Sequence, residues 1–139
     1  LAIDTKSPAK LYLAGWARAA GMHGEGGGIY LSDDGGRVWR QVLDRDQHVY
    51  DVTADARDPR LLFAAGFESS AWRSTDRGEH WARIAGFNFK WGHRVIPDPL
   101  DKASVYVTTF GGSVWHGSIN GQPKPLDIVT PTLDPGYLQ

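Results

Sequence analysis

The sequence of 139 residues predicts an all-β fold built from three copies of a four-stranded antiparallel sheet. Three observations lead to this prediction. A turn pattern with a glycine and a tryptophan occurs twice, and short strand-like segments recur around it at a regular spacing. The composition, with 6 Trp, 5 Tyr, 5 Phe, 17 Gly and 8 Pro, is typical of many short strands joined by tight turns.

The repeated pattern reads Ser-x-Asp-x-Gly-x-x-Trp, and its two copies begin 42 residues apart. The matched positions are Ser32, Asp34, Gly36 and Trp39 in the first copy and Ser74, Asp76, Gly78 and Trp81 in the second. The Asp can accept hydrogen bonds from amides of its own turn, the Gly can adopt a positive φ, and the Trp ring can cover the turn. Acidic loop residues could instead serve catalysis or bind calcium. The structural interpretation is favoured, because a catalytic site is rarely duplicated together with its turn glycine.

The predicted strands repeat in the same order in each copy. The first strands end with the segments Leu1–Asp4, Val52–Asp55 and Val95–Asp98. The second strands are expected at Leu11–Gly15, Leu62–Gly66 and Val105–Thr109. The third strands are expected at Ile29–Leu31, Ala71–Arg73 and Val114–His116. The first and second strands keep offsets of 51 and 43 residues. Four strands repeated with a period in the low forties predict β-propeller blades, at residues 1–48, 49–91 and 92–130, before a Pro-rich tail at 131–139.

The third blade is degenerate, because Gly117–Gln122 stands where a third copy of the turn pattern belongs. Asn120 and Gly121 still suit a hairpin, and we expect the fourth strand at Leu126–Thr130, flanked by prolines. Three blades do not close a ring, and a propeller of six to eight blades needs roughly 250–340 residues. We expect the C-terminal part of a longer protein; the alternative is a ring completed by several chains.

The turn pattern resembles the Asp-box, or BNR repeat, of sialidases, sortilin-type receptors and xyloglucanase-type glycosidases. The resemblance implies a β-propeller in which the box lies between the third and fourth strands of a blade, away from the ligand face. It also implies an extracytoplasmic location, secreted or periplasmic. It is specific for the architecture and says little about the activity.

Charge and composition exclude several classes of function. The net charge is −1, from 15 basic and 16 acidic residues, with no basic stripe, so neither nucleic acid nor an anionic membrane is an expected partner. No apolar run is long enough to span a membrane. There is no cysteine, no metal-binding histidine spacing and no phosphate-binding glycine pattern, so we expect no metal and no cofactor.

The loops of the predicted ligand face collect aromatic and charged side chains. The candidate ligand-binding residues are Trp16, Tyr50, Asp51, Phe67, Trp91, His93, Arg94 and Phe110. Aromatic faces stack on sugar rings, and Asp, Arg and His bond hydroxyl or carboxylate groups, so one interpretation is a carbohydrate site. The other is packing between blades, which is favoured for the three aromatic residues at repeated positions after the second strands.

Hydrolysis of a glycosidic bond usually needs two carboxyl groups, and the candidates on ligand-face loops are Asp51, Glu68 and Glu25. In enzymes of the xyloglucanase type, the resemblance implies carboxylates from different parts of a larger assembly. A sialidase-like site would need three arginines, whereas only Arg18 and Arg94 fall on suitable loops.

Three functions therefore remain open. The preferred one is a non-catalytic binding or scaffold portion of a propeller that recognises glycan or protein, with the remaining blades as partners. The alternative is the C-terminal part of a xyloglucanase-type glycoside hydrolase. The third is an assembly subunit that packs against other chains.

Overall fold

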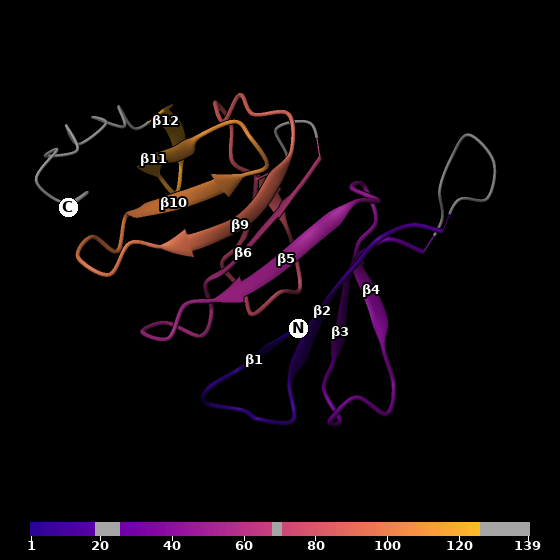
Figure 1. Ribbon diagram of the computed structural model, residues 1–139. Coiled ribbons are helices and arrows are strands. Elements are labelled where there is room, and N and C mark those ends of the chain that lie inside the picture. The colour runs from indigo at the N-terminus through magenta and orange to yellow at the C-terminus, as the bar shows by residue number, and fades with distance from the viewer. Residues whose placement is uncertain (19–25, 68–70, 126–139) are drawn as a thin grey trace, which may run out of the picture.

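The computed structural model describes residues 1–18, 26–67 and 71–125, which form three four-stranded antiparallel sheets (Figure 1). Sheet 1 contains β1 (Ala2–Ile3), β2 (Leu11–Gly15), β3 (Gly28–Ser32) and β4 (Arg40–Leu43). Sheet 2 contains β5 (Val49–Ala54), β6 (Leu62–Gly66), β7 (Ala71–Ser74) and β8 (Ala82–Arg83). Sheet 3 contains β9 (Gly92–Pro97), β10 (Ser104–Thr109), β11 (Val114–Ser118) and β12 (Gly121–Pro125). Neighbouring strands follow chain order in every sheet, which confirms the predicted fold class.

The predicted fourth strand of the third repeat is wrong. That strand is β12, which pairs with β11 from Ser118 opposite Gly121 to Trp115 opposite Pro125. The predicted segment Leu126–Thr130 lies outside the described residues. Pro123 and Pro125 lie within β12, although proline is ordinarily disfavoured in a strand. Because β12 is the edge of sheet 3, however, a proline that lacks an N–H group can be accommodated there.

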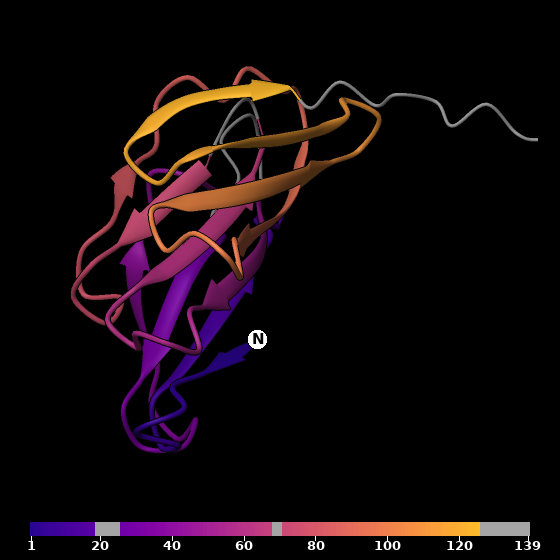
Figure 2. The same ribbon diagram turned by 90° about the vertical axis from the view of Figure 1, so that its left-hand side faces the viewer.

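Sheet 2 lies between sheets 1 and 3, and Figure 2 shows the same stacking from the side. Two apolar cores fill the two spaces. The first core holds Tyr12, Ile29, Leu31 and Leu43 of sheet 1 against Val49, Val52, Leu62, Ala64, Trp72 and Trp81. The second holds Phe63, Ala65, Ala71, Ile84, Phe87 and Phe89 against Val95, Val105 and Val107 of sheet 3. Because alternate residues of β6 face opposite cores, that strand is buried along its whole length.

The outward face of sheet 1 carries apolar residues at the positions that, in sheet 2, pack against sheet 1. Leu1, Ile3 and Leu13 correspond, at the offset of 51 residues, to Val52, Ala54 and Ala64. The three residues of sheet 2 belong to or border the first core, whereas Leu1 and Ile3 are 69% and 51% exposed. Sheet 1 therefore presents an apolar face that is shaped like a sheet-to-sheet interface.

Both copies of the Asp-box form the same hydrogen bonds. Ser74 Oγ donates to Asp76 Oδ1 at 2.8 Å and accepts from the Gly78 amide at 2.9 Å, as Ser32 does with Asp34 and Gly36. The indole of Trp81 donates to the Gly78 carbonyl at 3.1 Å, and Trp39 makes the corresponding bond at 2.9 Å. Gly36 and Gly78 have φ values of 89° and 82°, which favour glycine.

The second box also holds sheet 1. The hydroxyl of Tyr12 donates to the carbonyl of Arg77 at 3.0 Å, and the Arg77 guanidinium lies 3.4 Å from the carboxylate of Asp4. Lys10 lies 3.3 Å from Glu79. Each of these contacts joins residues about seventy positions apart, so the box contributes to the interface between repeats as well as to its own turn.

We expect the box carboxylate of Asp76 to make folding sensitive to acid. Burial raises its pKa, but hydrogen bonds from the backbone and ring of His80 and from Ser74 outweigh that effect and lower the pKa from 3.8 to about 2. A depressed pKa contributes stability that is present above about pH 4 and is lost as the pH falls toward about 2. Carboxyl NMR titration should give a midpoint of about 2, and Asp76→Asn should lose less stability across this window than the parent. A midpoint near 3.8 would contradict the expectation.

Candidate functional site

Seven rings gather at one edge of the sheets, where the second strands end and the first strands begin. They form what we call the aromatic surface: Trp16, His48, Tyr50, Phe67, Trp91, His93 and Phe110. First and second strands are antiparallel neighbours, so the end of one lies beside the start of the other. Isolated backbone bridges accordingly join Trp16 to His48 and Phe67 to Trp91.

The contacts between these rings are continuous from sheet 1 to sheet 3. The ring centroid of Trp16 lies 4.5 Å from that of Tyr50 and 5.0 Å from that of Phe67. Tyr50 stacks on Phe67 and meets Phe110 at 4.9 Å. Phe67 reaches Trp91 at 6.0 Å. Trp16 meets its two neighbours edge-on and Tyr50 stacks on Phe67, which are geometries that aromatic pairs prefer, whereas the other two contacts are tilted.

Two irregularities in the strands contribute to this arrangement. The register of β5 against β6 shifts between Val49 and Asp51, and that of β9 against β10 shifts around His93. Tyr50 and His93 are therefore the extra residues of equivalent β-bulges. A bulge re-aims a side chain relative to the normal alternation, and both side chains join the aromatic surface.

The rings pack on one another and still face solvent. Trp16, Tyr50, Trp91 and Phe110 are 45%, 37%, 40% and 47% exposed. The ammonium of Lys90 lies 5.1 Å from the centroid of Trp91. Contiguous exposed apolar surface of this kind marks binding sites more often than it serves stability.

The two charged candidates of the inner strands pair with each other. Arg94 Nε lies 2.7 Å from Asp51 Oδ2, which also accepts a bond from the hydroxyl of Thr53 at 3.1 Å. Asp51 and Arg94 hold equivalent positions in β5 and β9, which lie side by side. The Asp51 carboxylate is therefore already engaged by a cation. The other two carboxylate candidates, Glu25 and Glu68, lie outside the described residues, and Arg18 is exposed beside the first gap.

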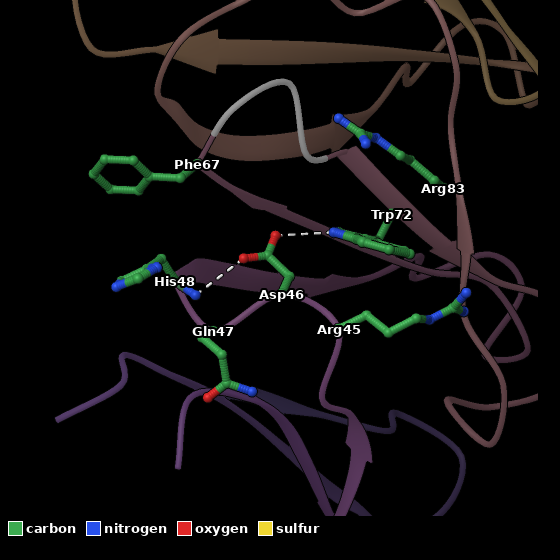
Figure 3. Close-up of a pocket in the computed structure, with 7 residues that line it drawn as sticks. All are labelled: Arg45, Asp46, Gln47, His48, Phe67, Trp72 and Arg83. Atoms are coloured by element: carbon green, nitrogen blue, oxygen red, sulfur yellow. Dashed lines mark hydrogen bonds between the residues drawn. The ribbon is translucent and has the colours of Figure 1, made fainter. Parts of the chain in front are cut away.

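A pocket of about 460 Å³ opens beside the aromatic surface (Figure 3). It is lined by Arg45, Asp46, Gln47, His48, Phe67, Trp72 and Arg83. We call it the side pocket, and it shares His48 and Phe67 with the aromatic surface. In Figure 3 the carboxylate of Asp46 lies between the indole of Trp72 and the backbone of His48.

Asp46 is the buried charge of the side pocket. It is only 9% exposed; one carboxylate oxygen accepts the Trp72 indole N–H at 3.0 Å, and the other accepts the His48 amide at 3.0 Å. The guanidinium of Arg45 lies 5.5 Å from the centroid of Trp72 and donates to the Trp81 carbonyl at 3.0 Å. The buried carboxylate therefore has neutral hydrogen-bond donors.

The sequence reasoning missed Asp46, although a signal was available. At the offset of 43 residues Asp46 corresponds to Phe89, which is 4% exposed and fills the second core. The first repeat therefore has a carboxylate at the position where the second repeat has a buried aromatic ring, and this difference between equivalent positions was the available signal. Trp72 and Arg83 were missed for another reason, since they come from strands or their ends rather than from the predicted ligand-face loops.

The described part of the chain contains no cluster of three or more His, Cys, Asp or Glu side chains able to hold a metal ion. Among the same residues, no helix is long and apolar enough to cross a membrane.

Known proteins resemble this chain over most of its length. No protein-family model matches it. A xyloglucanase of Acetivibrio thermocellus is 32% identical over 120 residues, covering 68% of this chain and 14% of the relative. A second sequence with that name and organism is 31% identical over the same shares.

Solved structures give the same architecture. An ancestral GH74 enzyme superposes with a TM-score of 0.70 at 18% identity, covering 90% of this chain and 19% of that one. The GH74 xyloglucanase of Xanthomonas campestris superposes with a TM-score of 0.58 at 16% identity, covering 84% and 20%. The chain thus resembles part of a GH74 xyloglucanase propeller, and it spans 14% of the length of the curated relative.

Proposed function

We propose that this chain is part of a xyloglucanase-type glycoside hydrolase and that its aromatic surface binds the glycan. The observation that carries the proposal is the continuous run of partly exposed rings at one edge of the sheets. Pyranose rings have apolar C–H faces that stack on aromatic rings, while their hydroxyl groups bond polar side chains around them. The sequence similarity to a xyloglucanase supports xyloglucan as the ligand.

The arrangement of the rings supports binding rather than packing alone. A ring that only joined two sheets would be covered by them, as Phe63 is at 1% exposure. Trp16 and Phe110 are each nearly half exposed in spite of their ring contacts. Leaving this apolar area in water forgoes about 25 cal/mol per Å², a loss that a bound sugar would recover.

Hydrolysis usually needs two carboxyl groups, one to protonate the glycosidic oxygen and one to act as the nucleophile or to activate a water molecule. We assign the described residues to substrate binding, because Asp51 is engaged by Arg94 and the other two candidates lie outside the described residues. The apolar outward face of sheet 1 supports further blades as partners. We also propose an extracytoplasmic location, where polysaccharide substrates are met.

A second candidate function is a glycan-binding module without catalysis. The ion pair between Asp51 and Arg94 favours it, because it engages the one catalytic carboxylate candidate that lies among the described residues. The two functions differ in one readout. Both predict glycan binding, and only the first predicts the release of new reducing ends.

Truncating the aromatic surface should abolish most of the glycan affinity. Trp16→Ala and Phe110→Ala should each weaken the binding of a xyloglucan oligosaccharide by about tenfold or more, equivalent to about 1.4 kcal/mol, when measured by isothermal titration calorimetry. Leu100→Ala is the matched control, because Leu100 is 96% exposed on the loop that leads into β10 and takes no part in the described ring contacts. Unchanged affinity in both aromatic variants would sink the proposal.

A further inference from the structure

We propose that Asn120 is a site of spontaneous deamidation and that Arg73 directs the reaction toward aspartate. Asn120 and Gly121 belong to the hairpin turn between β11 and β12, in which Ser118 pairs with Gly121. Three features of this turn support the proposal. No side chain follows Asn120, a guanidinium group bonds its side-chain carbonyl, and the turn is anchored on neighbouring segments.

The covalent change needs only the chain, solvent base and water. The backbone nitrogen of Gly121 loses its proton to solvent and forms a bond to Cγ of Asn120. The bond from Cγ to the side-chain nitrogen then breaks, and that nitrogen takes up a proton and leaves as ammonia. Water opens the resulting cyclic imide. Opening at the side-chain carbonyl gives aspartate, whereas opening at the backbone carbonyl gives isoaspartate, in which the main chain runs through Cβ and Cγ.

The reacting atoms of the turn are accessible. Asn120 is exposed, and Gly121 has no side chain to hinder its own nitrogen as it approaches Cγ. β12 is the edge strand of sheet 3, so no further strand of the described chain covers the turn on that side. The other asparagine of the sequence, Asn88, is also exposed, but the bulky residue Phe89 follows it. We therefore expect Asn120 to react much faster than Asn88.

The guanidinium of Arg73 bonds the carbonyl that is attacked. Arg73 Nη1 donates to Asn120 Oδ1 and, at 3.0 Å, to the backbone carbonyl of Ile119. Because a guanidinium group has only donors, the amide atom that it meets is the oxygen. A charged donor stabilises the negative charge that develops on this oxygen when nitrogen or water attacks Cγ. The contact therefore favours both closure of the imide and its opening at the side-chain carbonyl, which gives aspartate.

The turn is held in place beside this cation. Ile119 packs against the second core, and its amide donates to the Ala103 carbonyl at 2.8 Å. On another side, a Cβ atom built on Gly121 would lie only 2.9 Å from the Ala85 carbonyl oxygen. Arg73 itself comes from β7 of sheet 2. A donor that is already in position needs no rearrangement when charge develops, which makes its stabilisation effective.

The test compares the native protein with the same protein in urea, both kept in mildly alkaline buffer. Peptide mapping by mass spectrometry measures the loss of each asparagine, because an acid and an amide differ in mass. An enzyme that methylates only isoaspartate separates the two products. In the native protein we expect Asn120 to react about tenfold or more faster than Asn88. A rate at Asn120 no greater than that at Asn88 overturns the modification site.

The ratio of products tests the role of Arg73. We expect aspartate in excess in the native protein and isoaspartate in excess in urea, where unfolding separates the guanidinium from the turn. The same ratio in both conditions contradicts direction by Arg73.

A pair of substitutions isolates the guanidinium. Arg73→Met removes the donor from Asn120 Oδ1 and should shift the native ratio of products to that seen in urea. Arg60→Met removes the same charge from the turn before β6, where the guanidinium bonds Asp58, and should keep the excess of aspartate. An unchanged excess of aspartate in Arg73→Met refutes the role of Arg73. The comparison in urea needs no variant, so the inference stays testable if Arg73→Met folds poorly.

Discussion

Gly78→Ala should destabilise the protein by about 3 kcal/mol or more, the largest loss expected from adding one methyl group to either Asp-box. Gly78 has a φ of 82°, and a Cβ atom there would lie 2.7 Å from Cε1 and 3.1 Å from Cδ1 of Tyr12. The ring of Tyr12 cannot give way easily. It is fully buried in the first core, and its hydroxyl bonds the Arg77 carbonyl. The substitution would therefore separate sheet 1 from sheet 2.

Gly35→Ala isolates the backbone strain from the clash. Gly35 has a φ of 73°, and nothing lies within 4 Å of a Cβ atom built on it. In the second box the matching residue is Arg77, which accepts a φ of 62°. We expect a loss of about 1 kcal/mol from conformation alone. Urea denaturation of both variants and the parent gives the comparison, and equal losses would show that Tyr12 does not restrict Gly78.

Trp81→Ala should cost about 3–5 kcal/mol, whereas Trp39→Ala in the described chain should cost about 1 kcal/mol. The two residues occupy the same position of the box and form the same indole hydrogen bond. They differ in what covers them. Trp81 is 6% exposed in the first core, while Trp39 is half-buried on a box with no sheet beyond it in the described chain.

This pair of variants also measures whether further blades are present. In a longer protein with another sheet on the outward face of sheet 1, Trp39 would be covered as Trp81 is, and its truncation would cost as much. The measurement is the midpoint of urea unfolding for the 139-residue chain and for any longer form. Equal losses in the short chain would contradict the difference in burial described above.

Periodicity made most of the fold predictable. The strands of sheets 1 and 2 could be predicted from the sequence for two reasons. The Asp-box marks the turn of a hairpin, and the constant spacing between repeats locates the equivalent strands around it. The last strand could not, because Pro123 and Pro125 argue against a strand unless its place at the sheet edge is known. Local sequence does not contain that information.

The candidate site was predictable where it follows the repeat. Trp16, Phe67 and Phe110 were expected at one edge, and their rings take part in one continuous cluster there. The ion pair of Asp51 with Arg94 joins two positions of the same register, so it could have been anticipated from adjacent inner strands.

The side pocket depends on information that periodicity does not carry. It requires Trp72 of β7, whose indole N–H donates a hydrogen bond to Asp46 in the loop before β5. This contact depends on how sheets 1 and 2 stack, because the stacking determines which side chains reach the loop before β5.

The second box stabilises the sheet that precedes it in the chain, and this has a consequence for folding during biosynthesis. Tyr12 and Asp4 of the first sheet are held by Arg77 from the following repeat. A ribosome that has delivered only the residues up to Leu43 has therefore made every strand of sheet 1 without the contacts that fasten it. Until Trp81 emerges, the Tyr12 ring and its apolar neighbours face water, and the nascent chain exposes surface that a chaperone would recognise. Because a repeat gains these contacts only after the next repeat has been synthesised, folding of such a chain should lag synthesis by about one blade.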